Sequence, residues 1–527
     1  MEHFPSHAPL LPEILALHGQ WRNTKTAVIC GAESLSWREF TSGYHQLANG
    51  LLSRDLNVGD SVAIVMSNGI PMLNALMACM SAGLVSVPIN LSVNDDALVN
   101  MVKDAAAKGI IVTDDQRQRL DAVIGRLDQP NLIKVCENSA TGWISMGMLS
   151  KDQSTEQPDV LIPDEAPLNV IYSSGTTGLP KGILATQKGR RDWAYDLAIA
   201  LRYHGEARTL MTIGLYSNIS WVAMLSTLLA GGCLVIEKQF DAKLALEQIQ
   251  TQKITHFAMV PIQFQRLIEV MEQSQKSFDV ASVHAMMSCG SPLHADLKRK
   301  IFAHFSCGII ELYGLTEGVI TTLDTGDAEG RWSSVGKPLI GTDIKIVDDS
   351  DREVAAGESG EIVSRGRITM PGYLNREDAN EEATYLDSQG RRWLRTGDIG
   401  HLDHEGFLYI VDRKKDMILT GGQNVYPQDI EAILIQHPKV NDVAVIGAKS
   451  ARWGETPIAV VVPEAKLVNE SKADFAQDIM AWLNPQLGKQ QRIDDVVFIE
   501  ELPRNPNGKI LKRELRTTLQ LPIYHQN

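Results

Sequence analysis

Short apolar segments alternate with segments of helical periodicity along most of this chain, and this alternation limits the possible folds more than any other feature. Val62–Met66 is followed by a helical pattern at Pro71–Ser81 and by a second apolar run at Leu84–Ile89. His256–Val260 is followed in the same way by Gln263–Gln273. Further pairs of this kind are Asp95–Ala107 with Gly109–Thr113 and His294–His304 with Ile309–Tyr313. Such alternation predicts an α/β fold with largely parallel sheets.

The pattern changes after about residue 330, where glycine, aspartate and short strands become frequent. Apolar runs at Asp343–Val347, Gly360–Ser364 and Gly406–Val411 predict a small β-rich subdomain. The charged run Asp412–Asp416 then fits either a solvated turn or a hinge. Beyond it an α/β pattern returns, which predicts a separate C-terminal domain. Its expected elements are Asp429–Gln436, Val440–Gly447, Pro457–Pro463, Asp474–Leu483 and Val496–Ile499.

The overall composition excludes several classes of protein. A net charge of −14 argues against non-specific binding to nucleic acid, because that binding needs a basic surface. The 6 cysteines are scattered without a C-x-x-C pair, so neither a metal site nor a disulfide framework is indicated. The uncharged run from Ser61 is broken by Gly69, Pro71 and Gly83, which favours strand–helix–strand over a membrane span. No secretory signal precedes the chain's first elements, and we expect a cytoplasmic protein.

One segment combines an apolar strand with a glycine-rich turn. Residues Ile171–Gly182 read Ile-Tyr-Ser-Ser-Gly-Thr-Thr-Gly-Leu-Pro-Lys-Gly. Backbone N–H groups of such a turn form a nest for anionic oxygens, and Lys181 adds a positive charge. The spacing differs from a Walker A loop, in which the lysine follows the second glycine directly. The segment predicts a polyphosphate site made by Ser173, Ser174, Gly175, Thr176, Thr177, Gly178 and Lys181.

Further motifs follow in a fixed order, and each is weak by itself. Together with the phosphate loop they resemble the adenylate-forming superfamily of acyl-CoA synthetases, luciferases and peptide-synthetase adenylation domains, within it most closely the bacterial acid–CoA ligase branch. The resemblance runs from about residue 25 to residue 516. It is carried by Tyr313-Gly-Leu-Thr-Glu317, Gly360-Glu-Ile-Val-Ser-Arg-Gly366, Thr396-Gly-Asp398, Asp412-Arg-Lys-Lys-Asp416, Gly421-Gly-Gln-Asn-Val-Tyr-Pro427 and Asn507-Gly-Lys509.

The resemblance implies an α/β fold with a large N-terminal domain over residues 1–412, made of two αβ-layered subdomains plus the β-rich one. A hinge at 413–416 and a small mobile α+β C-terminal domain over 417–527 would follow. The implied enzyme uses ATP and Mg²⁺ to convert a carboxylic acid into an acyl-adenylate and pyrophosphate. A thiol, here coenzyme A, then displaces AMP.

The same resemblance assigns roles in the first step, where two anions must meet and cations must neutralise them. Glu317 would hold Mg²⁺, a hard cation that prefers oxygen ligands. Thr316 would bond the α-phosphate, and Lys509 would bridge the carboxylate and that phosphate. The nucleoside would be held by Asp398 at the ribose with Arg413 nearby, and by Tyr313 at the adenine with Gly290, Ser291 and Pro292 opposite.

In the second step the C-terminal domain would rotate about Lys415, which matches the hinge position of the family. Gly421 and Gly422 would then border the pantetheine tunnel, because glycine allows a close approach of the backbone. Trp453 and Arg492 match positions that contact the nucleotide and a phosphate of CoA in some relatives. A buried core tryptophan and a solvated arginine are the plain alternatives for these two residues.

The acid itself is less well defined by the sequence. Ser217 stands where amino-acid-activating relatives have aspartate, and a buried ammonium without a partner would be costly, so an amino acid is disfavoured. Ser217 and Gln187 also replace histidines common in the family. The expected wall (Ile213, Tyr216, Ser217, Trp221, Met287 and Ile320) is largely apolar and shows no obvious cation, which disfavours dicarboxylates. A medium-chain fatty acid or an aromatic acid of the cinnamate or benzoate kind fits.

Two alternatives share the same motifs. An enzyme that loads the acyl group onto a separate carrier protein would adenylate without free-CoA turnover. A non-catalytic nucleotide-binding protein would have no need of Glu317, Asp398 and Lys509, so their presence argues against it. The expected partners are therefore a small carboxylic acid and CoA, without nucleic acid or a membrane-spanning segment. A homodimer is possible, since dimers are common among relatives.

Overall fold

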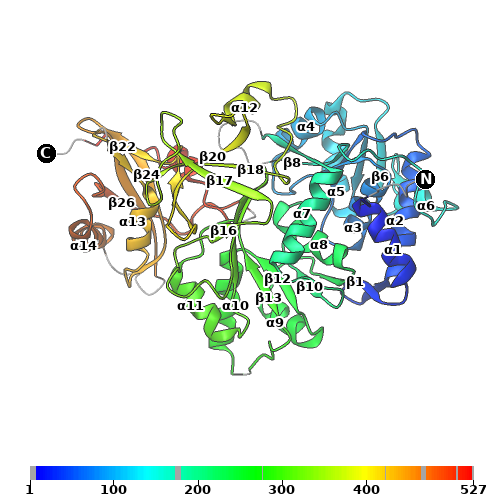
Figure 1. Cartoon of the computed structure of the whole chain (residues 1–527), viewed down its shortest axis with the longest axis horizontal. Coiled ribbons are helices and arrows are strands. Elements are labelled where there is room, and N and C mark those ends of the chain that lie inside the picture. The colour runs from blue at the N-terminus through cyan, green and yellow to red at the C-terminus, as the bar shows by residue number, and fades with distance from the viewer. Residues whose placement is uncertain are drawn as a thin grey trace. The chain divides into compact units, whose positions relative to one another are not determined.

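The computed structural model describes residues 8–172, 180–275, 277–421, 423–464, 471–505 and 508–524. It divides into two compact units (Figure 1). The first unit comprises Met1–Gly330, Pro338–Asp343 and Arg365–Thr384, and the second comprises Arg331–Lys337, Ile344–Ser364 and Tyr385–Asn527. The chain therefore passes between the units several times. The hinge predicted at 413–416 lies within the second unit, and its mobility stays a prediction.

Two mostly parallel sheets form the centre of the first unit. Within its described residues, one seven-stranded sheet has the order β7 (Ile144–Ser145), β6 (Ile133–Cys136), β5 (Gly109–Val112), β3 (Ser61–Val65), β4 (Val85–Pro88), β8 (Pro167–Tyr172) and β9 (Gly182–Thr186). The nine-stranded sheet of the described chain has the order β16 (Lys337–Pro338), β15 (Val319–Leu323), β14 (Ile310–Leu315), β13 (Ala285–Ser288), β12 (His256–Met259), β10 (Arg208–Met211), β11 (Cys233–Ile236), β1 (Thr26–Cys30) and β2 (Glu33–Ser36).

Helices cover both faces of each sheet. The helices described in the first unit are α1 (Leu11–Trp21), α2 (Trp37–Leu52), α3 (Ile70–Ser81), α4 (Asp95–Asp104), α5 (Asp114–Val123), α6 (Met146–Ser150), α7 (Gln187–Ala200), α8 (Asn218–Ala230), α9 (Ala242–Thr251), α10 (Pro261–Gln273), α11 (Ala295–His304) and α12 (Glu377–Glu382). The largest hydrophobic cluster takes residues from α1, α2, α3, α7, α8 and from strands of both sheets, so these helices lie between the sheets. Coverage of both faces explains why the parallel strands are almost continuously apolar.

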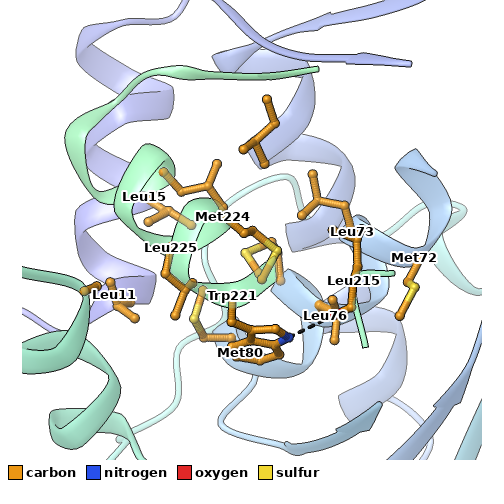
Figure 2. Packing of buried hydrophobic residues seen from close by; sticks show 14 of the residues in the cluster. Leu11, Leu15, Met72, Leu73, Leu76, Met80, Leu215, Trp221, Met224 and Leu225 are labelled. Carbon is orange, nitrogen blue, oxygen red and sulfur yellow. Dashed lines mark hydrogen bonds between the residues drawn. The ribbon is translucent and has the colours of Figure 1, made fainter. Parts of the chain in front are cut away.

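Part of this central cluster lies around Trp221 (Figure 2). Its indole packs among Leu76 and Met80 of α3 and Leu225 of α8, and its exposed fraction is 1%. The indole Nε1 donates a hydrogen bond to the carbonyl oxygen of Leu215 at 2.9 Å. A buried indole N–H needs such a partner, so this bond also fixes the chain just before α8.

The second unit contains two five-stranded sheets among its described residues. In the first, the order is β17 (Thr342–Val347), β18 (Gly360–Gly366), β20 (Arg392–Leu402) and β19 (Thr384–Leu386), with β21 (Leu408–Arg413) also paired to β20. In the second, the order is β23 (Gln423–Val425), β22 (Ile418–Thr420), β25 (Gly454–Pro463) and β24 (Val440–Ser450), with β26 (Asp495–Phe498) on β25. The helices α13 (Pro427–Leu434), α14 (Lys472–Leu483) and α15 (Lys512–Thr518) accompany the second sheet.

The predicted α/β class and the predicted β-rich region are confirmed. The uncharged run after Ser61 forms β3, α3 and β4, and no helix in the described part of the chain is long and apolar enough to cross a membrane. Several boundaries were wrong, and the helix expected at Asp95–Ala107, for example, ends at Asp104. Ala106 there adopts φ +46°, and the amides of Ala106 and Ala107 bond back to the carbonyls of Lys103 and Val102. A left-handed residue with these two bonds terminates a helix, normally on glycine.

Candidate active site

The two ends of the predicted phosphate loop lie side by side. Strands β8 and β9 pair antiparallel, with Tyr172 opposite Gly182, and the loop connects them. Of the predicted loop residues only Lys181 is described. Ser173, Ser174, Gly175, Thr176, Thr177 and Gly178 lie outside the described residues, as does Gly422, so their roles stay predictions.

A tight hairpin presents the second predicted group, Thr316 and Glu317. The turn joins β14 to β15, and the amide of Gly318 donates to the carbonyl of Leu315 at 3.1 Å. Gly318 has φ +104°, and a Cβ at this position would lie 2.1 Å from the carbonyl oxygen of Ile368. Only glycine fits here, which places the Glu317 carboxylate reproducibly at the hairpin tip. Thr316 and Glu317 are half-buried.

The remaining predicted nucleoside contacts of the first unit lie at one edge of the nine-stranded sheet. Strands β13 and β14 are parallel, with Ser288 opposite Glu311, so both end at the same edge. Gly290 follows β13 there with φ +93°, and the half-buried Tyr313 lies at the end of β14. The carboxyl ends of parallel strands are where open α/β sheets bind ligands. The sheet thus brings Gly290, with Ser291 and Pro292 after it, close to Tyr313.

The expected acid wall belongs to the same sheet. Ile213, Tyr216 and Ser217 lie in the segment that follows β10. Met287 lies on β13, and Ile320 lies on β15. The side chain of Ser217 caps α8 by accepting from the amide of Ile219 at 3.3 Å. Most of these residues are buried, and burial raises the pKa of the half-buried Tyr216. Trp221, Met287 and Ile320 share the central hydrophobic cluster, against which Tyr216 packs, and the role of these residues as an acid wall stays a prediction.

Asn68 holds this segment, although nothing in its sequence context singled it out. Its Nδ2 donates to the carbonyls of Ile213 at 3.2 Å and Glu237 at 3.3 Å, and its Oδ1 accepts from the amide of Leu215 at 2.8 Å. Asn68 follows β3 of the other sheet, so one side chain links the two sheets at the expected acid wall.

One buried cation, Arg190, packs against the core residue Trp221, and the expectation of a wall without a cation stays a prediction. The guanidinium of Arg190 lies 4.8 Å from the ring centre of Trp193 and 5.2 Å from that of Trp221. Its Nε donates to Oδ1 of the fully buried Asn169 at 2.9 Å. Arg190 itself is 4% exposed, and burial lowers its pKa to about 9. The sequence around Arg190 did not indicate that its side chain would be buried.

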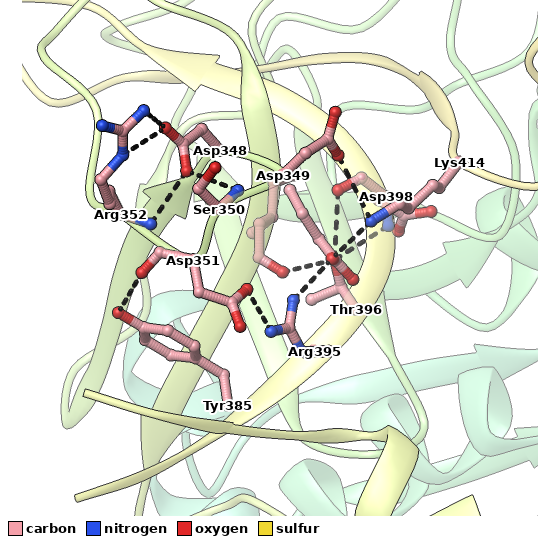
Figure 3. Close-up of polar contacts among 12 residues, drawn as sticks. Asp348, Asp349, Ser350, Asp351, Arg352, Tyr385, Arg395, Thr396, Asp398 and Lys414 are labelled. Carbon is pink, nitrogen blue, oxygen red and sulfur yellow. Dashed lines mark hydrogen bonds and ion pairs between the residues drawn. The ribbon is translucent and has the colours of Figure 1, made fainter. Parts of the chain in front are cut away.

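In the second unit, Asp398 and Arg413 form an ion pair. They stand opposite one another on β20 and β21, with Arg413 Nε 2.6 Å from Asp398 Oδ1. The Thr396 hydroxyl accepts from the amide of Asp398 at 3.0 Å and donates to the carbonyl of Ile362 at 2.8 Å (Figure 3). The Thr-Gly-Asp motif is therefore a rigid turn that fixes the buried Asp398 carboxylate.

Cations gather around this carboxylate. Burial lowers the pKa of Lys509 to about 8, and the charges of Arg413 and Lys415 add to this effect, while Asp398 and Asp416 oppose it. Partial burial and Arg413 also lower the pKa of Lys415 to about 8. Arg516 lies 3.2 Å from Oδ1 of Asp416 and also lowers the pKa of Lys415, so we call Arg413, Lys415, Lys509 and Arg516 the cation cluster. These cations outnumber Asp398 and Asp416, so the cluster gains electrostatic energy when an anion binds.

A cavity of about 850 Å³ lies beside Trp453 in the second unit. Its lining includes Leu419, Lys449, Trp453 and Ile523. The cations Arg452 and Lys489 lie 4.8 and 5.8 Å from the Trp453 ring centre. An aromatic face with nearby cations suits a nucleotide. Arg492, predicted to meet a CoA phosphate, is exposed and does not line the cavity.

Gly421 makes close contact with the same tryptophan. Its amide donates to the Trp453 carbonyl at 2.8 Å, and a Cβ on Gly421 would lie 2.6 Å from the indole Cε3. With φ +57°, this position needs glycine for two independent reasons.

The residues present fit a magnesium ion that arrives with a nucleotide. In the described part of the chain, no group of three or more His, Cys, Asp or Glu side chains could hold a metal. Mg²⁺ keeps several waters and is often bound by one carboxylate together with substrate phosphates. Glu317, half-buried at its hairpin tip, supplies such a carboxylate.

Comparison with known proteins decides the family. The model of the AMP-binding enzyme family matches residues 18–374, and that of the AMP-binding enzyme C-terminal domain matches residues 429–509. The chain belongs to the AMP-binding enzyme family. The predicted adenylate-forming enzyme of the acid–CoA ligase class is thereby confirmed.

Curated relatives of this AMP-binding enzyme include CoA ligases of different acids. It is 31% identical to a feruloyl-CoA synthase of Amycolatopsis sp over 93% of this chain and 95% of that protein. It is 30% identical to the long-chain-fatty-acid–CoA ligase FadD13 of Mycobacterium tuberculosis over 92% of both chains. Among solved structures, ATP-bound MatB from Rhodopseudomonas palustris matches with a TM-score of 0.86 and 26% identity, over 97% of this chain and 99% of that chain.

Proposed function

We propose that this AMP-binding enzyme joins a medium-chain fatty acid or an aromatic acid to CoA, with consumption of ATP and release of AMP and pyrophosphate. The cation cluster carries the proposal. Lys509, Lys415 and Arg413 interact electrostatically with one another and with Asp398, and burial lowers the pKa values of both lysines. Like charges held together in this way are costly unless an anionic ligand neutralises them. ATP and a carboxylate are such ligands.

In the first step a carboxylate oxygen bonds to the α-phosphorus, and the bond to the bridging oxygen of pyrophosphate breaks. Glu317 would hold Mg²⁺, which would supply positive charge for the phosphates, and Lys181 would add its own charge. Asp398 accepts from the ribose hydroxyls, and Lys509 stabilises the charge that develops at the α-phosphate. In the second step the CoA sulfur attacks the acyl carbonyl carbon, and AMP leaves.

The CoA nucleotide would use the cavity beside Trp453. Its indole face would stack on adenine, and Lys449, Arg452 or Lys489 would meet phosphate oxygens. Arg492, expected from the sequence to meet a CoA phosphate, lies outside this lining, and its contact with CoA stays a prediction. Rotation about Lys415 between the two steps, and a homodimer, remain parts of the proposal that the family resemblance alone supports.

The substrate class rests on the expected wall. Ile213, Met287 and Ile320 are buried apolar side chains, which suit an alkyl chain or an aromatic ring. The feruloyl-CoA synthase and the fatty-acid ligase among the relatives support the same two classes.

The test is AMP release with ATP and Mg²⁺, using fatty, cinnamic, benzoic and dicarboxylic acids, each with and without CoA. CoA-dependent AMP release that peaks on one acid class supports the ligase and identifies its substrate. Pyrophosphate release without CoA-dependent turnover points to a carrier-protein acceptor. Binding of ATP without release of either product contradicts an enzymatic role.

A further inference from the structure

A short segment of the first unit contacts both Glu317 and the strand that follows the phosphate loop. We call Met370–Arg376 the strap. The amide of Met370 donates to the carbonyl of Glu317 at 2.8 Å, and the amide of Leu374 donates to the carbonyl of Gly182 at 2.8 Å. Tyr373 also forms an antiparallel bridge with Ile183 on β9. The strap therefore connects the hairpin of Glu317 to the strand that follows the phosphate loop.

The side chain of Tyr373 makes this connection chemically specific. Its hydroxyl donates to Oε1 of Glu317 at 3.0 Å. Its ring centre lies 4.9 Å from Nζ of Lys181. The backbone of Tyr373 is fixed by Asn380, which accepts from its amide at 2.7 Å and donates to its carbonyl at 3.1 Å. One phenol thus contacts the proposed metal ligand and the proposed phosphate lysine.

The far end of the strap reaches the other side of the loop. Arg376 Nη1 lies 2.9 Å from Oδ1 of Asp104, and Asn375 Nδ2 donates to the Asp104 carbonyl at 3.0 Å. The second oxygen of Asp104 accepts from the hydroxyl of Tyr172 at 2.8 Å. Tyr172 is the last residue of β8, before the phosphate loop. The strap is consequently anchored to the chain on both sides of the loop.

We propose that Tyr373 is a positioning residue for the first half-reaction, which orients the Glu317 carboxylate for Mg²⁺ and holds Lys181 beside it. This rests on the proposed function. A hydrogen bond to one carboxylate oxygen fixes the plane of the group and leaves the other oxygen for the metal. The ring attracts the ammonium without neutralising it. Both groups thus keep their charges for the metal and for phosphate, which an acidic residue in place of Tyr373 would not allow.

Two substitutions separate the hydroxyl from the ring. Tyr373→Phe keeps the ring and removes the donor, so the Mg²⁺ concentration for half-maximal pyrophosphate release should rise about 10-fold. The KM for ATP at saturating Mg²⁺ should stay unchanged. Tyr373→Leu removes both contacts, and that KM should rise as well. Electron paramagnetic resonance can measure the affinity of the enzyme for Mn²⁺ in the presence of α,β-methylene-ATP. This affinity should weaken about 10-fold in Tyr373→Phe.

Tyr385→Phe is the matched control, because its hydroxyl donates to the Asp351 carbonyl at 3.3 Å in the second unit. Its Mg²⁺ dependence should equal that of the wild type. The inference would be overturned if Tyr373→Phe kept the Mg²⁺ dependence and the Mn²⁺ affinity of the wild type. It would also be overturned if Tyr373→Phe lowered the melting temperature and kcat but changed neither the Mg²⁺ dependence nor the Mn²⁺ affinity. If the wild-type enzyme itself releases no pyrophosphate with any acid, the proposed function fails instead, and Mn²⁺ binding still tests the positioning role.

Discussion

Raising the pH above about 8 should slow the first half-reaction, because Lys509 must be protonated to neutralise the carboxylate and the α-phosphate. Burial, together with Arg413 and Lys415, lowers the pKa of Lys509 from 10.5 to about 8. With a pKa of about 8, the protonated fraction falls from about 76% at pH 7.5 to about 9% at pH 9. The expected loss is therefore about 8-fold. A lysine at its ordinary pKa would lose about 3% over the same range.

The assay is kcat/KM for ATP in acid-dependent pyrophosphate release, since this parameter reports the pKa values of the free enzyme. Asp416→Asn removes an acid that raises both lysine pKa values, so the decline should move to lower pH. Lys415→Met removes a like charge and should move it to higher pH. Asp478→Asn, an acid paired with Lys439 at 3.1 Å, is the matched control and should leave the profile unchanged.

A flat profile between pH 7.5 and 9 in the wild type would refute the reasoning. If Lys415→Met abolished the decline rather than moving it, the titrating group would be Lys415. The same shift in Asp416→Asn and Asp478→Asn would show a general charge effect and no local coupling within the cation cluster.

Three further outcomes are expected. Lys509→Ala should abolish adenylate formation and leave thioester formation from a supplied adenylate intact, and loss of both would contradict the separate roles. Lys415→Pro should impair the second half-reaction far more than the first, because proline restricts the backbone of the proposed hinge, whereas in the first step loss of the Lys415 charge shifts only the pH profile; equal losses in half-reaction assays would exclude the hinge. Glu311→Gln should destabilise the enzyme by about 3–5 kcal/mol in chemical denaturation, because it leaves the 2%-exposed Lys298 without its carboxylate. Adding Lys298→Met should restore part of that stability, whereas an additive loss would show that the buried pair is not coupled.

Much of the fold follows from local sequence patterns. Val62–Met66 and Pro71–Ser81 have the hydrophobic periodicity of a strand and a helix, and the structure has β3 and α3 there. Hydrophobic periodicity did not predict every strand. Strand β20 runs through the Thr396-Gly-Asp398 turn, where the sequence pattern is interrupted and no strand was expected. The residue types of the motifs also identified the family, because phosphate, metal and ribose contacts each need particular side chains.

The arrangement of those side chains was decided by tertiary structure. Lys509 looks like an ordinary turn lysine in the sequence, and only its approach to Arg413 and Lys415 lowers its pKa. Tyr373 and Arg190 gave no local signal. Tyr373 contacts Glu317 and Lys181, which are distant along the chain, and Arg190 contacts two tryptophan rings. Burial and electrostatic coupling depend on which distant segments meet, whereas periodicity and residue type are properties of short segments, so the sequence by itself determined the elements and the chemistry but not their juxtaposition.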